Sequence, residues 1–67
     1  MANKFVSFEM VFHTGPIFTG NMVIQYSDIT SEQDVKNVET YIKQKLNVSQ
    51  DINGLVDVVT LINWKTL

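Results

Sequence analysis

Few side chains in this sequence are of the kinds that carry out catalysis or bind metals. His13 is the only histidine and cysteine is absent, which excludes a Cys–His pair and a zinc site built from thiolates or from two histidines. The acidic residues Glu32, Asp34 and Glu39 fall on a helical segment that is predicted to face solvent, so they do not converge in a cleft as acid–base carboxylates must. We therefore expect a protein that is not an enzyme and that holds no metal or cofactor.

The segment HTGPIFTGN is the strongest candidate for ligand or partner contact, because its glycines allow close backbone approach and its side chains add hydroxyl and amide groups. These polar and glycine members are His13, Thr14, Gly15, Thr19, Gly20 and Asn21. The segment could cradle a phosphate, but no Gly-Lys-Ser/Thr follows it, and it leads into a strand where anion-binding glycine loops lead into a helix. The favoured alternative is a hairpin loop whose glycines adopt positive φ. A further alternative is a docking tip that exposes Ile17 and Phe18. His13, at the end of a strand, would then face solvent or contact the ligand.

A second candidate contact lies near the end of the chain, where Trp64 and Lys65 are adjacent. An aromatic ring at this position could stack on a base or could close the hydrophobic core. The net charge is −2 and the five lysines form no basic stripe, so duplex nucleic acid is not an expected ligand. Single-stranded nucleic acid remains an alternative ligand, because the chain has aromatic side chains that could stack on bases. The sequence lacks, however, the positive groove that proteins of this kind use.

Length and composition favour one small folded domain spanning residues 1–67. The chain has 67 residues, 45% of them apolar and 18% charged, which is enough apolar material for a packed core. Neither a long apolar run at the start nor 18 consecutive apolar residues elsewhere is present. We expect a cytoplasmic protein that does not enter a membrane.

Three segments have the pattern of strands. Residues 5–12 alternate, with Val6, Phe8, Met10 and Phe12 on one face, and residues 22–26 resume the alternation after a loop at 13–20. Residues 55–64 follow a polar loop at 47–54 and are apolar on both faces. The three phenylalanines Phe5, Phe8 and Phe12 are assigned to the core.

A helix is expected to begin near Ser31. Either Thr30 with Gln33 or Ser31 with Asp34 could form its capping arrangement. One apolar stripe has helical spacing and is made of Val35, Val38, Ile42 and Leu46. On the exposed side, opposite charges four residues apart pair Glu32 with Lys36 and Glu39 with Lys43.

The order strand, strand, helix, strand predicts an α+β fold. A right-handed crossover places the third strand beside the first, giving a three-stranded, mainly antiparallel sheet of order 2-1-3 with the helix on one face. The opposite face would carry Val11, Val23, Val59 and Leu61. One helix cannot cover both faces, so we expect a homodimer or a docked partner on that face or on an edge strand.

The chain resembles a group of small phage and prophage proteins of Gram-positive bacteria. The resemblance covers most of the chain and depends on Phe5, Ser7 and Phe8, on Gly20-Asn21, on the helix pattern DVKNVETYI and on the closing LINWKTL. Pro16-Ile17-Phe18 and residues 47–54 depart from the pattern of the group. The resemblance implies an accessory phage protein in the host cytoplasm, and it carries over no catalytic residue.

These observations lead to a hypothesis of stoichiometric binding, in which the protein inhibits a host protein or a host defence system. The alternative is a sponge that sequesters a small signalling nucleotide, using Gly15 to Asn21 with Trp64 or Lys65 at a dimer interface. Single-stranded nucleic-acid binding is the second alternative.

Overall fold

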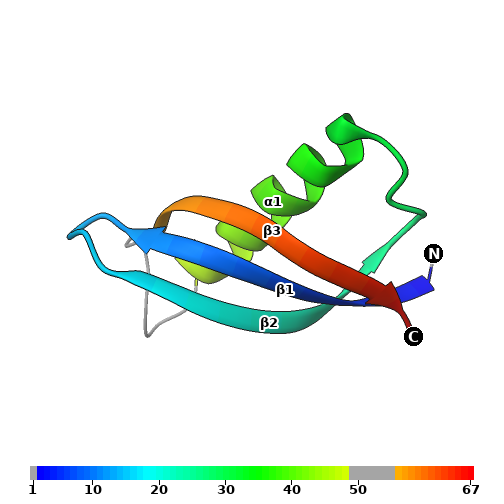
Figure 1. Ribbon diagram of the computed structural model, residues 1–67, viewed down its shortest axis with the longest axis horizontal. Helices are drawn as coiled ribbons and strands as arrows, with labels where there is room; N and C mark the ends of the chain where they lie inside the picture. Colours follow the sequence, from blue (N-terminus) through cyan, green and yellow to red (C-terminus); the bar gives the residue numbers. More distant parts are fainter. Residues whose placement is uncertain (1, 49–55) are drawn as a thin grey trace.

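The computed structural model describes residues 2–48 and 56–67, and their elements follow the order β1, β2, α1, β3. The sheet is antiparallel throughout, with strand order β2-β1-β3. The helix packs against the sheet, and both chain ends lie at the opposite end of the sheet from the β1–β2 turn (Figure 1). The expected α+β fold, including the strand order, is confirmed.

Strands β1 (Ala2–Phe12) and β2 (Ile17–Tyr26) form a hairpin with uninterrupted register from Ala2↔Tyr26 to Val11↔Ile17. A four-residue turn closes it, where the Gly15 N–H donates to the Phe12 carbonyl at 2.9 Å and Gly15 has φ +110°. The expected loop at 13–20 is therefore too long. Residues 17–21 belong to β2, because β-branched side chains extend the pairing with β1 to the turn.

Helix α1 (Glu32–Asn47) begins where the sequence predicts. Ser31 is the N-cap, and its hydroxyl accepts a hydrogen bond from the Asp34 N–H at 3.1 Å while Asp34 accepts from the Ser31 N–H at 3.2 Å. This capping box selects Ser31 with Asp34 over Thr30 with Gln33. Of the apolar stripe, Val38 and Ile42 are fully buried, whereas Val35 and Leu46 are partly buried at its ends.

Strand β3 (Val56–Thr66) contains two irregularities that change which side chains face the helix. Its register against β1 skips Asp57 and Ile62, and each extra residue shifts the alternation by one position. As a result Val59 and Leu61 point to the helix and are 7% and 9% exposed. Their expected place on the opposite face is wrong, because strict alternation does not hold across a bulge. The expected loop at 47–54 begins too early, because Asn47 is still in α1 and Val48 is its C-cap. Residues 49–55, which include the rest of this loop and the predicted start of the last strand, lie outside the described residues.

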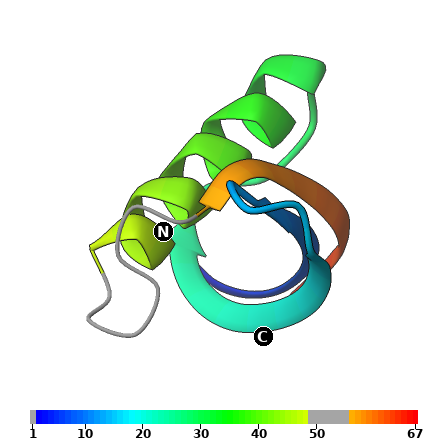
Figure 2. The same ribbon diagram turned by 90° about the vertical axis from the view of Figure 1, so that its left-hand side faces the viewer.

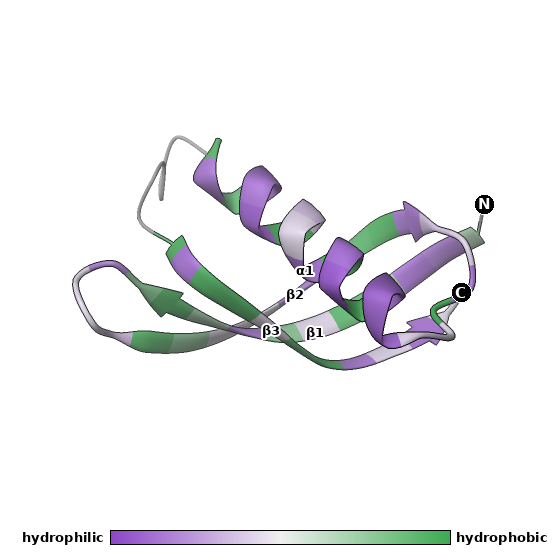
Figure 3. Ribbon diagram, turned by 90° about the horizontal axis from the view of Figure 1, so that it is seen from above, coloured by the Kyte–Doolittle hydropathy of each residue, from purple (hydrophilic) through white to green (hydrophobic). Residues whose placement is uncertain are grey.

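The core lies between the helix and one face of the sheet, and Figure 3 shows the opposite face without a covering element among the residues that the structure describes. The sheet is strongly twisted, and α1 runs along the outside of its curve beside β3 (Figure 2). The buried hydrophobic side chains are Val6, Phe8, Ile24, Val38, Ile42, Val56, Val59 and Leu61. Because α1 packs mainly on β3, the side chains of β2 on the helix side are covered only in part.

Candidate functional site

The uncovered face of the sheet, which we call the open face, carries the odd-numbered residues of β1 and β2. The register aligns them in rows across the three strands. From the β1–β2 turn toward the chain ends, these rows are Val58–Val11–Ile17, Thr60–Glu9–Thr19, Asn63–Ser7–Asn21 and Lys65–Phe5–Val23. Two rows that contain apolar side chains thus enclose two polar rows.

The row nearest the turn is wholly apolar. Ile17 is 62% exposed and Val58 is 51% exposed, and both flank Val11 directly across the sheet. Phe18 lies on the other face of β2 at the same end, 50% exposed, with its ring 5.1 Å from that of Phe12. The turn end of the hairpin is therefore hydrophobic on both strands (Figure 3). An exposed apolar row of this kind is suited to contact with another molecule.

A polar pair borders this apolar row. The His13 Nδ1 lies 3.4 Å from an Asp57 carboxylate oxygen, and both side chains are more than half exposed. Asp57 reaches this position because it is the extra residue of a bulge in β3. His13 therefore lies at the solvent-exposed turn, as one of the two sequence interpretations expects.

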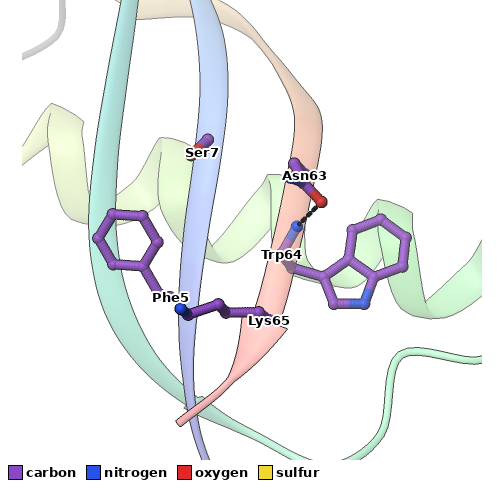
Figure 4. Close-up of a pocket in the computed structure, with 5 residues that line it drawn as sticks. All are labelled: Phe5, Ser7, Asn63, Trp64 and Lys65. Atoms are coloured by element: carbon purple, nitrogen blue, oxygen red, sulfur yellow. Dashed lines mark hydrogen bonds between the residues drawn. The ribbon is translucent and has the colours of Figure 1, made fainter.

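The row Lys65–Phe5–Val23 borders a shallow recess of about 180 Å³. This recess is lined by Phe5, Ser7, Asn63, Trp64 and Lys65. The side chain of Lys65 runs across β1 toward Phe5, and Ser7 lies further along β1, while the Trp64 ring points away beyond β3 (Figure 4). A cation, an aromatic ring, a hydroxyl and an amide thus meet at one place. This volume is below the roughly 300–1,000 Å³ that is usual for small-molecule sites.

Phe5 was assigned to the core from the sequence, and this assignment is wrong. It lies at an odd position of β1, and its neighbours Val6 and Lys4 point to the helix side instead. The cross-strand partners of Phe5 are Val23 and Lys65, which are both on the open face. Alternation along β1 therefore excludes Phe5 from the core, and Phe5 becomes a member of the recess.

Trp64 is 39% exposed and lies on the helix side of the sheet, opposite Val6. It lines both the recess beside Lys65 and a second recess with Ile29 and Val35 at the start of α1. Trp64 is not among the residues that pack against the hydrophobic core, so the structure favours the accessible aromatic over core closure.

The structure separates the candidate contact residues into two groups. His13, Thr14 and Gly15 lie at the turn with Ile17 and Phe18 beside them, whereas Trp64 and Lys65 lie at the other end of the sheet. The row of Val11 lies six residue steps along β1 from the row of Phe5, which corresponds to about 20 Å. Within one chain the two groups therefore do not form one site.

Gly20 has a structural role inside β2 that the sequence interpretation as a loop glycine missed. A Cβ at this position would lie 3.1 Å from two ring carbons of Phe8, which is the direct partner of Gly20 on β1. Gly15 alone adopts the positive φ that was expected of both glycines. Gly20 thus allows Phe8 to pack closely beside β2, whereas Gly15 supplies the positive φ of the turn.

Two polar residues that sequence reasoning overlooked form hydrogen bonds to the backbone of β3, one at its start and one in its middle. The Asn47 side chain donates to the Val56 carbonyl and accepts from the Val56 N–H, both at 3.0 Å, as a neighbouring strand would. Glu39 accepts from the Leu61 N–H at 2.7 Å, although it was expected to pair with Lys43. In the sequence, the only hint of these contacts is that the amphipathic pattern of the helix ends at Asn47.

Lys4 is the one buried charged residue among those that the structure describes. It is 2% exposed, and its Nζ donates to the Thr66 hydroxyl at 2.7 Å and lies 3.6 Å from an Asp28 carboxylate oxygen. These contacts connect β1 to the end of β3 and to the segment before α1. Lys4 is therefore part of the packing and lies away from the open face.

The hydrogen bonds of the helix cap change the acidity of Asp34. The backbone N–H of Thr30 and the hydroxyl of Ser31 are the main causes that lower the pKa of the Asp34 carboxyl below its ordinary value of 3.8. The hydroxyl of Tyr26 adds a contact at 3.3 Å. This carboxylate is engaged in capping the helix and is not free for acid–base chemistry.

Over residues 2–48 and 56–67, no three His, Asp or Glu side chains are close enough to hold a metal ion. The helix that the structure describes is not long and apolar enough to cross a membrane.

Comparison of the chain with protein-family models, with curated proteins and with solved structures finds no significant match.

Proposed function

We propose that this chain is a non-enzymatic binding protein that acts by forming a stoichiometric complex with another protein. On the resemblance to phage proteins we further propose that it is an accessory protein that inhibits a host protein or defence system in the host cytoplasm. The observation that supports this proposal is the exposed apolar row Val58–Val11–Ile17, which spans all three strands on the face opposite the helix.

The surroundings of this row indicate the chemistry of the partner. Glu9 lies in the row next to that of Val11 on the open face, and Asp57 is the neighbour of Val58 in β3. A partner surface that buries the apolar row would meet these carboxylates at its rim. We therefore expect an apolar patch on the partner with basic side chains around it.

The proposal is tested by capturing partners from a lysate of a Gram-positive host with the tagged chain and with matched variants. Ile17→Thr combined with Val58→Thr keeps β-branched residues in both strands but places hydroxyls in the apolar row. Val23→Thr is the control, because it makes the same type of change on the same face in a distant row. Val23 is similarly exposed, at 52%.

We expect one host protein to be retained at a 1:1 ratio of chains by the natural chain and by Val23→Thr. The double variant should bind this host protein at least about tenfold more weakly, because hydroxyls replace buried methyl groups. The absence of any stoichiometric partner, or equal binding by the double variant, would contradict the proposal.

The recess at Phe5 and Lys65 supports the nucleotide sponge as a second candidate. A ring and an ammonium group side by side can stack on a base and pair with a phosphate. Titration calorimetry with cyclic dinucleotides and ADP-ribose should give binding heat with the natural chain and none with Lys65→Met, because the recess then lacks its cation. The absence of heat with every nucleotide would exclude the sponge.

A further inference from the structure

The two edges of the sheet differ in how their backbone groups are satisfied. On β3, outward-facing groups of Val56, Leu61 and Trp64 are hydrogen-bonded by the side chains of Asn47, Glu39 and Asn63, respectively. These contacts block a further strand from pairing with β3. On the outer edge of β2, by contrast, no side chain among residues 2–48 and 56–67 hydrogen-bonds to the backbone.

The backbone groups that β2 presents at this edge can be identified from the hairpin. The Phe12 N–H donates to the Pro16 carbonyl at 2.9 Å, so the even-numbered residues of β1 direct their backbone groups toward β2. Because the register has no shift, their even-numbered partners on β2 point back to β1. The odd-numbered residues therefore point their N–H and C=O groups outward, and they are Ile17, Thr19, Asn21, Val23 and Gln25.

The outer edge of β2 lacks the features that usually prevent strand pairing. Its sequence IFTGNMVIQY contains no charged residue and no proline over ten residues, and its pairing with β1 contains no bulge. Natural proteins protect exposed edges of this length with such features. Their absence here indicates that the edge has a partner strand.

We propose that this partner is a second copy of the chain, with the two β2 strands pairing antiparallel about a two-fold axis at Asn21. Asn21 is the outward-facing residue nearest the middle of β2, so this register uses nearly the whole strand. It places Asn21 opposite Asn21 of the second copy and Thr19 opposite Val23 of the second copy. The result is one six-stranded sheet with both helices on the same side.

The side chains of β2 are complementary to one another in this register. On the helix side, Gly20 faces Met22 of the second copy, so a long side chain meets a position that has none. Phe18, half exposed in the single chain, faces Ile24 of the second copy, which gives an aromatic and β-branched cross-strand pair. On the open face the two Asn21 amides meet at the axis and can hydrogen-bond to each other.

This arrangement also changes the relation between the two groups of candidate contact residues. Ile17 of one copy lies opposite Gln25 of the other, so the turn of each chain approaches the end of the sheet that holds Phe5 and Lys65 in its partner. The polar row of Asn63, Ser7 and Asn21 then continues through the axis into the same row of the second copy.

The test uses charge at the axis. Asn21 is exposed, so Asn21→Lys and Asn21→Asp should each fold as well as the natural chain. In the dimer each variant places two like charges directly opposite one another, which disfavours pairing. Light scattering at micromolar concentration should give twice 7.7 kDa for the natural chain and 7.7 kDa for each variant alone. An equal mixture of the two variants should return to the doubled mass, because opposite charges then meet.

Thr60→Lys is the control, since it places a charge on the open face of β3 and should leave the doubled mass unchanged. The unfolding midpoint of the natural chain should also rise with protein concentration, whereas that of Asn21→Lys should not. A natural chain of 7.7 kDa, or an Asn21→Lys variant that keeps the doubled mass, would overturn the proposed pairing.

Discussion

The ring of Phe8 packs closely beside Gly20, its partner across the β1–β2 pair, so that a side chain on Gly20 would press against the ring. A Cβ on Gly20 would lie 3.1 Å from Cε2 and Cζ of Phe8 and 3.2 Å from Cε of Met10. Phe8 is 1% exposed and is held by the core on its other sides, so the ring cannot move away easily. This contact explains why a glycine lies in the middle of a strand, where it would otherwise weaken the sheet.

Gly20→Ala should therefore destabilise the fold by about 1–3 kcal/mol, as overpacking of a core does. Urea unfolding followed by circular dichroism measures the loss. Phe8→Leu combined with Gly20→Ala should be less destabilised than the sum of the two single variants, because a smaller side chain at position 8 accommodates the methyl group. Strict additivity would show that the two positions are not in contact.

The helix cap predicts a specific dependence of stability on pH. Hydrogen bonds from the Thr30 N–H and the Ser31 hydroxyl lower the pKa of Asp34, so folding favours the ionised carboxyl. This contribution is present above the unfolded-state pKa near 3.8 and is lost as the pH falls through the lower folded-state pKa. Asp34→Asn should be less stable than the natural chain at neutral pH, and the difference should shrink as the pH falls below about 4. A difference that is constant with pH would contradict this origin.

Buried Lys4 should tolerate an apolar replacement of similar length better than truncation. Its stem is packed in the fold, while its partners Thr66 and Asp28 are exposed and can be solvated when the ammonium group is removed. Lys4→Met should change the free energy of unfolding by less than about 1 kcal/mol, whereas Lys4→Ala should lose about 1–3 kcal/mol. Equal losses for the two variants would show that the charge, and not the packing of the stem, is required.

The side-chain cap of β3 at Asn47 should be important for stability. Asn47→Ala removes both the donor and the acceptor that satisfy buried Val56, which should cost about 1–3 kcal/mol in denaturant unfolding. Asn63→Ala is a matched control, because Asn63 also caps a backbone N–H of β3 but at an exposed position. Its cost should stay within about 0.5 kcal/mol. Similar losses for both would indicate that burial of Val56 is not the cause.

A large part of the fold could be predicted from local patterns. The alternation of β1 identifies the core residues Val6 and Phe8, and the spacing of Val38 and Ile42 identifies the buried face of the helix. The Ser31 hydroxyl, which accepts a hydrogen bond, and the carboxylate of Asp34 locate the start of the helix. These features could be predicted because the residues that cause them are close together in the sequence.

Local patterns were insufficient where a residue depends on a partner strand. Gly20 was placed in a loop because glycine usually ends a strand, but the ring of Phe8 fills the space beside it. Val59 and Leu61 were assigned to the wrong face because two bulges interrupt the alternation of β3. Each of these corrections depends on pairing with β1, which is distant in the sequence from β3.

The sequence by itself determined the order of the elements, the helix with its cap and the face of β1 that is buried, because periodicity and capping act over a few residues. The tertiary structure decided which residues share the open face, how far Lys65 lies from Gly15, and which edge is capped by Asn47 and Glu39. These relations arise from cross-strand register and from contacts between helix and strand, which join residues that no local pattern connects.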